Sequence, residues 1–231
     1  MSRGKSDRTQ YNRVCYLMVF LRHFEIKDVR LKVKYTKKIV KAYRPEQLDA
    51  LFAAANPDEW LMFMFLLCTG MREQEASHVE CKDIDWVRLT VKVSQKSDWK
   101  PKDSEEREIP IPNALVEELK MKITTSTNSL IFPNRDGGRD TCMLKKLERL
   151  VKRANLQWEG GLHTFRKSFA ALQYKAGVDA RTIQKRLGHS DLATTLAYLE
   201  GEDPRLSEAA TRQMRRLAYS PKLRNFQPSP S

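Results

Sequence analysis

Two stretches of sequence, LHTFRKSFA at residues 162–170 and LGHSDLATTLAYLE at residues 187–200, determine how the second half of this chain folds. The first has the character of a helix. In the second, Gly188 predicts a helix end, and Ser190 can cap the helix that follows it and carries Tyr198. A tight corner at Gly188 would turn the Tyr198 helix back toward the first one, so we expect these two helices to lie side by side.

The side chains on these helices suit chemistry at a phosphodiester. His163 and Arg166 are three residues apart and share one face of a helix. A phosphodiester gains negative charge as it is attacked, and planar guanidinium groups match its oxygens well; Arg72, in TGMREQEA, supplies a second one. Tyr198 is the candidate nucleophile, because neighbouring arginines favour its phenolate and a histidine can accept its proton. A lysine on a mobile hairpin could protonate the leaving 5′-oxygen, and no metal or other cofactor is required.

Charge and composition point to a polyanionic partner. The 231 residues carry a net charge of +13, and this charge is concentrated at the two ends. Residues 1–44 hold 13 Lys and Arg against three acidic residues, and residues 205–231 hold six against one. Residues 45–204 have a net charge of −2. We therefore predict that the ends bind nucleic acid.

Other features exclude several classes of protein. The longest apolar run, residues 61–68, is too short to cross a bilayer and suits a buried core helix. Charged residues interrupt the first fifteen positions, unlike a signal peptide. The four cysteines lack CxxC spacing, which favours reduced thiols over a zinc site or a disulfide framework. We expect a cytoplasmic protein that associates with the nucleoid when bound to DNA and has no membrane partner.

Periodicity predicts helices, then a small sheet, then more helices. The expected helices cover residues 9–24, 45–54, 58–68, 72–78, 115–123, 141–154, 164–176, 179–187, the segment after Ser190, and 204–217. The expected strands cover 85–93, 107–111 and 130–132, with a charged hairpin, SDWKPKDSEE, between the first two. The aromatic residues Trp60, Phe63 and Phe65 are expected in the core.

The ordered set of residues resembles the tyrosine recombinase (phage integrase) family over residues 44–217. Its members have Arg, Lys, His-x-x-Arg, His or Trp, and Tyr in that order, which here match Arg72, a hairpin lysine, His163 with Arg166, His189 and Tyr198. The resemblance implies an α+β, mainly helical catalytic domain with a small antiparallel three-stranded sheet. It also implies that Tyr198 forms a 3′-phosphotyrosyl intermediate, followed by strand exchange and religation without metal or ATP. Glu75 would orient Arg72 and balance its charge.

The hairpin lysine is assigned by the family's spacing. That lysine usually stands five residues before an arginine and eight before a proline, and Lys102 stands so before Arg107 and Pro110. Lys96, at the end of the first predicted strand, is the alternative.

The resemblance also suggests how the chain is divided. Residues 1–43 would be a basic arm with one helix and a linker, the remnant of a helical DNA-binding domain; residues 44–217 the catalytic domain; and residues 218–231 a flexible tail. We expect DNA contacts from the linker lysines and the residue that follows them, namely Lys32, Lys34, Lys37, Lys38, Lys41 and Arg44, although the linker could serve only as a tether.

The predicted function is therefore site-specific recombination or integration of double-stranded DNA, with self-association as dimers or tetramers on paired sites. The predicted 204–217 helix has an apolar stripe that would suit docking on a protein groove as well as packing within its own chain. The resemblance to the family implies that it packs on a neighbouring subunit. Two alternatives remain: a type IB topoisomerase-like enzyme that relaxes DNA, and a DNA-binding regulator that no longer cleaves.

Overall fold

A computed structural model describes residues 7–26, 29, 41–102, 106–124, 128–158 and 160–199. The chain divides into two compact units, residues 1–40 and 41–231. In the first, the described element is α1 (Asp7–His23), close to the predicted helix. The predicted 204–217 helix and linker residues 30–40 lie outside the described residues. None of the described helices is long and apolar enough to span a membrane.

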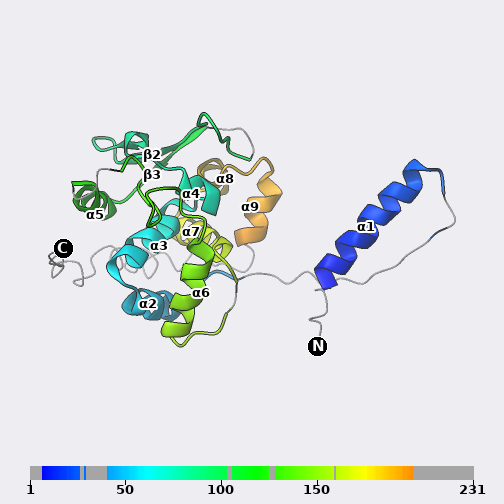
Figure 1. The fold of residues 1–231 in the computed structure, drawn as a ribbon, viewed down its shortest axis with the longest axis horizontal. Coiled ribbons are helices and arrows are strands. Elements are labelled where there is room, and N and C mark those ends of the chain that lie inside the picture. The colour runs from blue at the N-terminus through cyan, green and yellow to red at the C-terminus, as the bar shows by residue number, and fades with distance from the viewer. Residues whose placement is uncertain are drawn as a thin grey trace. The chain divides into compact units, whose positions relative to one another are not determined.

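The second unit is mainly helical, with a small sheet at one end (Figure 1). Helices α3, α4 and α7 lie between this sheet and the pair α2 and α6 (Figure 1). The helices are α2 (Pro45–Ala54), α3 (Pro57–Thr69), α4 (Glu73–Ser77), α5 (Asn113–Thr124), α6 (Met143–Arg153), α7 (His163–Lys175), α8 (Ala180–Leu187) and α9 (Leu192–Leu199). The strands are β1 (Ile84–Asp85), β2 (Thr90–Val93) and β3 (Arg107–Pro110).

Helix α3 is the centre of the core. It begins with a capping box, in which Asn56 Oδ1 accepts from the Glu59 backbone N–H at 2.9 Å while Glu59 Oε2 accepts from that of Asn56 at 3.1 Å. Every residue from Trp60 to Thr69 is buried, which confirms the predicted core positions. Phe63 stacks on Phe165 of α7 at 5.4 Å, so the central helix is packed directly against the helix that carries His163 and Arg166.

The sheet is three-stranded and antiparallel in the order β1-β2-β3, but its strands differ from those predicted. The stretch predicted as one strand, 85–93, forms two short strands around a turn in which Leu89 has φ of +53°. The predicted strand 130–132 was wrong: Leu130 makes an isolated bridge with Glu80. Period-2 alternation alone does not show where a strand reverses. Here the turn at 86–89 divides the predicted strand into two, β1 and β2, which gives the sheet its third strand.

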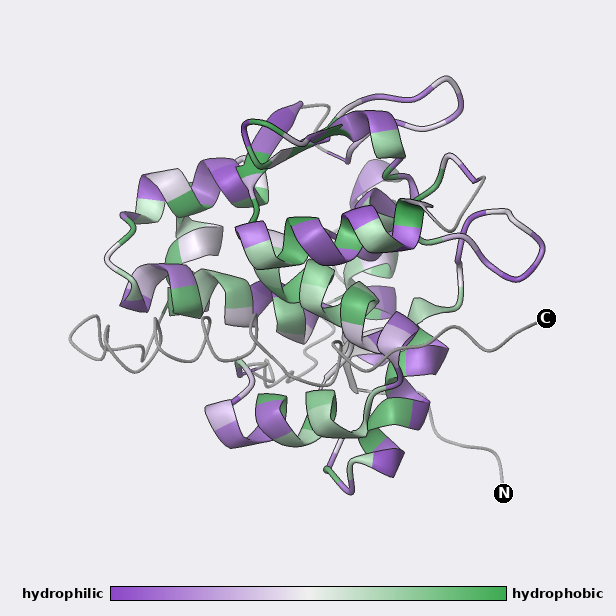
Figure 2. Ribbon diagram, turned by 90° about the vertical axis from the view of Figure 1, so that its left-hand side faces the viewer, coloured by the Kyte–Doolittle hydropathy of each residue, from purple (hydrophilic) through white to green (hydrophobic). Residues whose placement is uncertain are grey.

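Helices α7, α8 and α9 pack against one another, as the glycine corners predicted. Gly188 ends α8 in the left-handed region, with φ of +65°, and Asp179 caps its start by accepting from the Thr182 backbone N–H. The expected cap of the next helix was misplaced by one residue: the Asp191 carboxylate accepts from the Ala193 backbone N–H. In Figure 2 most helices carry both apolar and polar bands, consistent with one face packed inward and the other outward.

Candidate active site

Two helix C-termini organise the site. Gly70 ends α3 with φ of +62°, and Gly188 ends α8 with φ of +65°. A Cβ at residue 70 would lie 2.6 Å from the Phe169 ring, so glycine is needed there for space as well as conformation. The last carbonyls of a helix are acceptors with a partial negative charge, and both ends therefore favour cations.

Arg166 is the most deeply placed cation of the site, 1% exposed. Its guanidinium donates to the Gly70 carbonyl at 2.7 Å and to the Leu187 carbonyl at 2.5 Å, so it joins the ends of α3 and α8. Burial, together with the nearby charge of Arg72, lowers the pKa of Arg166 to about 10. The guanidinium therefore remains charged at neutral pH, in an orientation that two carbonyls determine.

Arg72 lies at the N-terminus of α4 and is held by Glu75. Its guanidinium donates to Glu75 Oε1 at 2.9 Å, and its backbone N–H donates to Glu75 Oε2 at the same distance. A further bond reaches the Gly188 carbonyl at 3.3 Å. Glu75 is buried, and its two bonds to Arg72 hold that residue in place.

Arg107 is a member of this cluster that sequence reasoning used only as a landmark. It donates to Glu75 Oε2 at 2.6 Å and to the Arg186 carbonyl at 2.8 Å, with its side chain 8% exposed. Burial would raise the pKa of Glu75, but the charge of Arg107, followed by its hydrogen bonds, brings that pKa below its usual value. The sequence signal that could have identified Arg107 is a charged residue in a predicted, partly buried strand.

Tyr198 faces two imidazoles. Its hydroxyl is hydrogen-bonded to Nε2 of His163, and the ring of His189 meets its ring edge-on at 5.0 Å between centroids. Nδ1 of His189 lies 2.9 Å from Thr195 Oγ1 on the helix that carries Tyr198. The structure thus brings together Arg72, Glu75, His163, Arg166, His189 and Tyr198.

The electrostatics of this pair favour a neutral histidine beside a protonated tyrosine. His163 retains exposed surface, but the burial of part of its side chain lowers its pKa, and the nearby charges of Arg166 and Arg72 lower it further. Burial raises the pKa of Tyr198, against the opposing charges of Arg166 and Arg72. At pH 7 the phenol therefore has a proton to give, and His163 has a lone pair to accept it.

A cavity of about 650 Å³ adjoins this cluster, and the hairpin contributes to its wall. The described residues that line it include two lysines, Lys100 and Lys102, as well as Arg72 and His163. Lys102 is exposed and close enough to His163 to lower the pKa of that ring. Lys100 is a second candidate at the same cavity, and sequence reasoning missed it because the family spacing selected Lys102.

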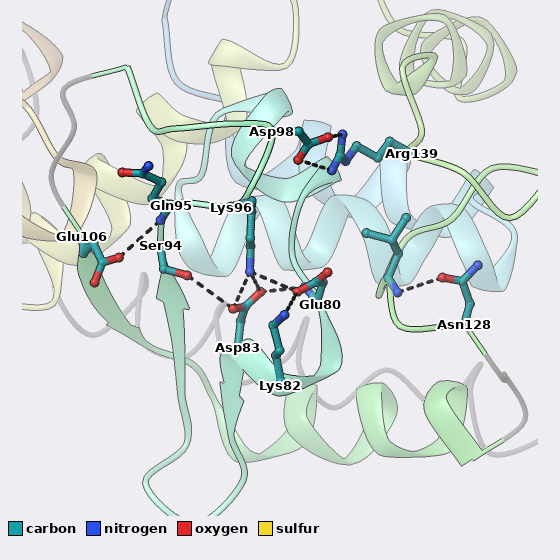
Figure 3. A network of polar contacts seen from close by, with 11 residues as sticks. Glu80, Lys82, Asp83, Ser94, Gln95, Lys96, Asp98, Glu106, Asn128 and Arg139 are labelled. Atoms are coloured by element: carbon teal, nitrogen blue, oxygen red, sulfur yellow. Dashed lines mark hydrogen bonds and ion pairs between the residues drawn. The ribbon is translucent and has the colours of Figure 1, made fainter.

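Lys96 is engaged elsewhere. Its ammonium lies 2.6 Å from both carboxylate oxygens of Asp83 and 3.3 Å from Glu80, and its side chain is 11% exposed (Figure 3). Three residues further on, Trp99 stacks on His78 at 4.4 Å. These contacts anchor the base of the hairpin, so the residues beyond Trp99 extend along the cavity.

The predicted DNA-binding residues fall mostly outside the described part of the chain. Lys32, Lys34, Lys37 and Lys38 lie there, whereas Lys41 and Arg44 are exposed residues just before α2. The Tyr43 backbone N–H donates to Ser168 Oγ on α7 at 2.8 Å. The chain thus enters the second unit beside the helix that carries His163 and Arg166.

Comparisons with known proteins agree with this fold. The model of the phage integrase family matches residues 41–204, and the chain belongs to that family. Tyrosine recombinase XerD of Staphylococcus aureus is 28% identical over 181 residues, and that of Staphylococcus saprophyticus is 31% identical; each match covers 71% of this chain and 59% of the relative. The chain thus spans about three fifths of the length of these relatives.

Solved structures resemble it as well. XerH recombinase bound to its difH substrate, in a pre-cleavage complex, has a TM-score of 0.67 at 25% identity, covering 90% of this chain and 66% of that one. The Tn1549 transposon integrase in complex with a circular-intermediate DNA has a TM-score of 0.72 at 20% identity, covering 91% and 80%. The second likeness concerns the fold alone.

Proposed function

We propose that this chain is the catalytic part of a site-specific DNA recombinase or integrase and that Tyr198 is its nucleophile. The observation that carries the proposal is the hydrogen bond between the Tyr198 hydroxyl and His163 Nε2, formed beside the guanidinium groups of Arg72 and Arg166. A nucleophile, a base and two oriented cations in one place are the groups that transfer of a phosphodiester to a protein side chain requires.

The reaction we infer conserves the ester bond. The Tyr198 oxygen attacks the scissile phosphorus while its proton passes to His163 Nε2; the bond from phosphorus to the 5′-oxygen breaks, and Lys102 gives that oxygen a proton. Arg72 and Arg166 bind the non-bridging oxygens, and His189 would donate a further hydrogen bond to one of them. Attack by the 5′-hydroxyl of a second strand reverses each step, so strand exchange needs neither ATP nor metal.

Double-stranded DNA is the proposed substrate, and self-association on paired sites is the proposed assembly. The solved structures of similar fold include XerH on difH and a lambda integrase dimer bound to a core site, and the basic arm of this chain adds electrostatic support. Sedimentation on a duplex that carries two sites should show two or more protomers. A single protomer per duplex at saturating protein would contradict the assembly proposal.

The proposed chemistry is tested by the formation of a covalent adduct between the protein and DNA. A pool of singly nicked duplexes with a randomised centre is incubated with the protein, and protein-linked DNA is recovered under denaturing conditions and sequenced. Tyr198→Phe should bind DNA and form no adduct, whereas the control Tyr174→Phe, also partly buried, should form it normally. An adduct that persists in Tyr198→Phe would refute the assignment.

Two further observations on the same protein separate the alternatives, a topoisomerase-like enzyme and a regulator that does not cleave. Relaxation of a supercoiled plasmid by a monomer would favour the topoisomerase-like function. DNA binding by wild-type protein with no adduct on any duplex of the pool would favour the non-cleaving regulator.

A further inference from the structure

Lys167 is a buried cation that the reaction above does not use. It follows Arg166 on α7 and is 9% exposed, and its ammonium lies 5.1 Å from the centroid of the Tyr198 ring. Helices α7 and α9 pack against each other, so this contact lies within their interface. Lysine is rarely buried unless an interaction compensates for lost hydration, and the contact with the Tyr198 ring is one such interaction.

The groups around Tyr198 come from three parts of the fold. His163, Arg166 and Lys167 lie on α7, Arg72 at the start of α4, and His189 in the corner between α8 and α9. His163 contacts the hydroxyl, whereas Lys167 lies over the ring. The hydroxyl and the ring face of Tyr198 therefore have different partners.

A cation over an aromatic ring is attracted by the negative face of the π-system. When the phenol loses its proton, the added charge spreads into the ring, so the attraction becomes stronger in the phenolate than in the phenol. An interaction that strengthens as the reaction proceeds accelerates it, whereas one of constant strength does not. Lys167 needs neither to gain nor to lose a proton for this effect.

We propose that Lys167 is a positioning residue, which holds the Tyr198 ring between α7 and α9 and stabilises the negative charge that the ring acquires as its proton passes to His163. This inference rests on the proposed function, because it assigns Lys167 a part in activating the same nucleophile. Burial is the main cause of the lowered pKa of His163, and the Lys167 ammonium lowers it further, so the charge of Lys167 also acts at the base.

The first test is the pH dependence of adduct formation, measured on a duplex recovered from the randomised pool. Lys167→Met keeps much of the aliphatic volume and removes the charge. We expect it to slow adduct formation about tenfold at pH 7 and to lose less as the pH rises, because hydroxide then assists ionisation of the phenol. Lys167→Arg should restore most of the rate.

The matched control is Lys152→Met, which removes the same charge from an exposed position on α6. It should leave the rate unchanged at every pH. A Lys167→Met variant that reacts at the wild-type rate, or that is slower by the same factor at every pH with no recovery in Lys167→Arg, would overturn the inference, since a purely structural role predicts the latter.

The second test needs no catalysis and so separates this inference from the proposed function. The protonation of His163 is followed by NMR in the DNA-free protein, with the resonance assigned through His163→Gln. Lys167→Met should raise the titration midpoint of His163, and Lys152→Met should not. An unchanged midpoint would overturn the placement of the Lys167 charge, whereas a raised midpoint in a protein that forms no adduct would support it while the proposed function failed.

Discussion

Glu75 is the residue on which the arrangement of the active site most depends. Its two carboxylate oxygens receive the guanidinium of Arg72 on one side and that of Arg107 on the other. A buried carboxylate between two cations is stable only because both partners are in place, and removing one partner of such a cluster typically costs about 3 to 5 kcal/mol. The Glu75 carboxylate thus fixes Arg72 relative to β3, the strand that carries Arg107.

The pH dependence of the reaction belongs to the residue scale. His163 acts as a base only when neutral, and its pKa lies below the usual value of about 6.5. Adduct formation at subsaturating DNA, which reports the free enzyme, should therefore not yet be limited by His163 at pH 7, persist as the pH falls through 6.5, and be lost only below it. An acid limb with a midpoint above 6.5 would contradict the lowered pKa.

At the scale of elements, the C-terminus of α8 is the common anchor of the site. Three consecutive carbonyls, those of residues 186, 187 and 188, each accept a hydrogen bond from a different arginine. These arginines come from β3, α7 and the N-cap of α4, and their like charges repel one another, which such acceptors offset. The negative end of a short helix therefore holds together three segments far apart in the sequence.

The end of α3 gives a prediction about packing. Gly70→Ala adds a Cβ 2.6 Å from the Phe169 ring in a left-handed conformation, and we expect a loss of about 2 to 5 kcal/mol in the free energy of unfolding. Gly177→Ala is the control, because Gly177 has φ of +85° and no atom within 4 Å of the added Cβ. It should lose only about 1 to 2 kcal/mol. Equal losses in urea unfolding would exclude the packing explanation.

The hairpin gives a prediction about proton transfer. Lys102→Ala should react slowly on ordinary DNA and recover when the 5′-bridging oxygen is replaced by sulfur, because a thiolate leaves without an acid. Lys96→Ala should show no such rescue, since Lys96 is occupied by Asp83 and Glu80. Lys100→Ala is measured beside them, and rescue in that variant alone would move the proposed acid two residues along the hairpin.

At the scale of the whole molecule, most of the net positive charge lies in a different part of the sequence from the candidate active-site residues. Residues 1–44 carry +10 while the site lies in a region of nearly balanced charge. If the arm binds phosphates, replacing both Lys37 and Lys38 by Gln should flatten the slope of log K against log salt by up to about 2 units. The control is the loss of two exposed lysines outside the arm, Lys120 and Lys152. Equal slopes in the two double variants would contradict a dominant role for the arm.

Much of this protein could be predicted from local sequence. Glycine at residues 70 and 188, apolar periodicity and the spacing of His163 and Arg166 depend on neighbours along the chain. Most helices, and candidates for the family's site residues, could therefore be predicted without coordinates. The turn at 86–89 and the cap at Asp191 were predicted incorrectly, because alternation and capping preferences are shared by adjacent residues.

Contacts between distant segments were decided only by the tertiary structure. Arg107 joins the site because β3 packs against α8. Lys96 is held away from it by its ion pair with Asp83, and Lys167 meets Tyr198 because α7 and α9 pack against each other. The sequence determined which side chains are available and on which local elements they stand. Their partners depend on where the backbone carries residues tens of positions apart, and a hydrogen bond or an ion pair acts over only a few ångströms.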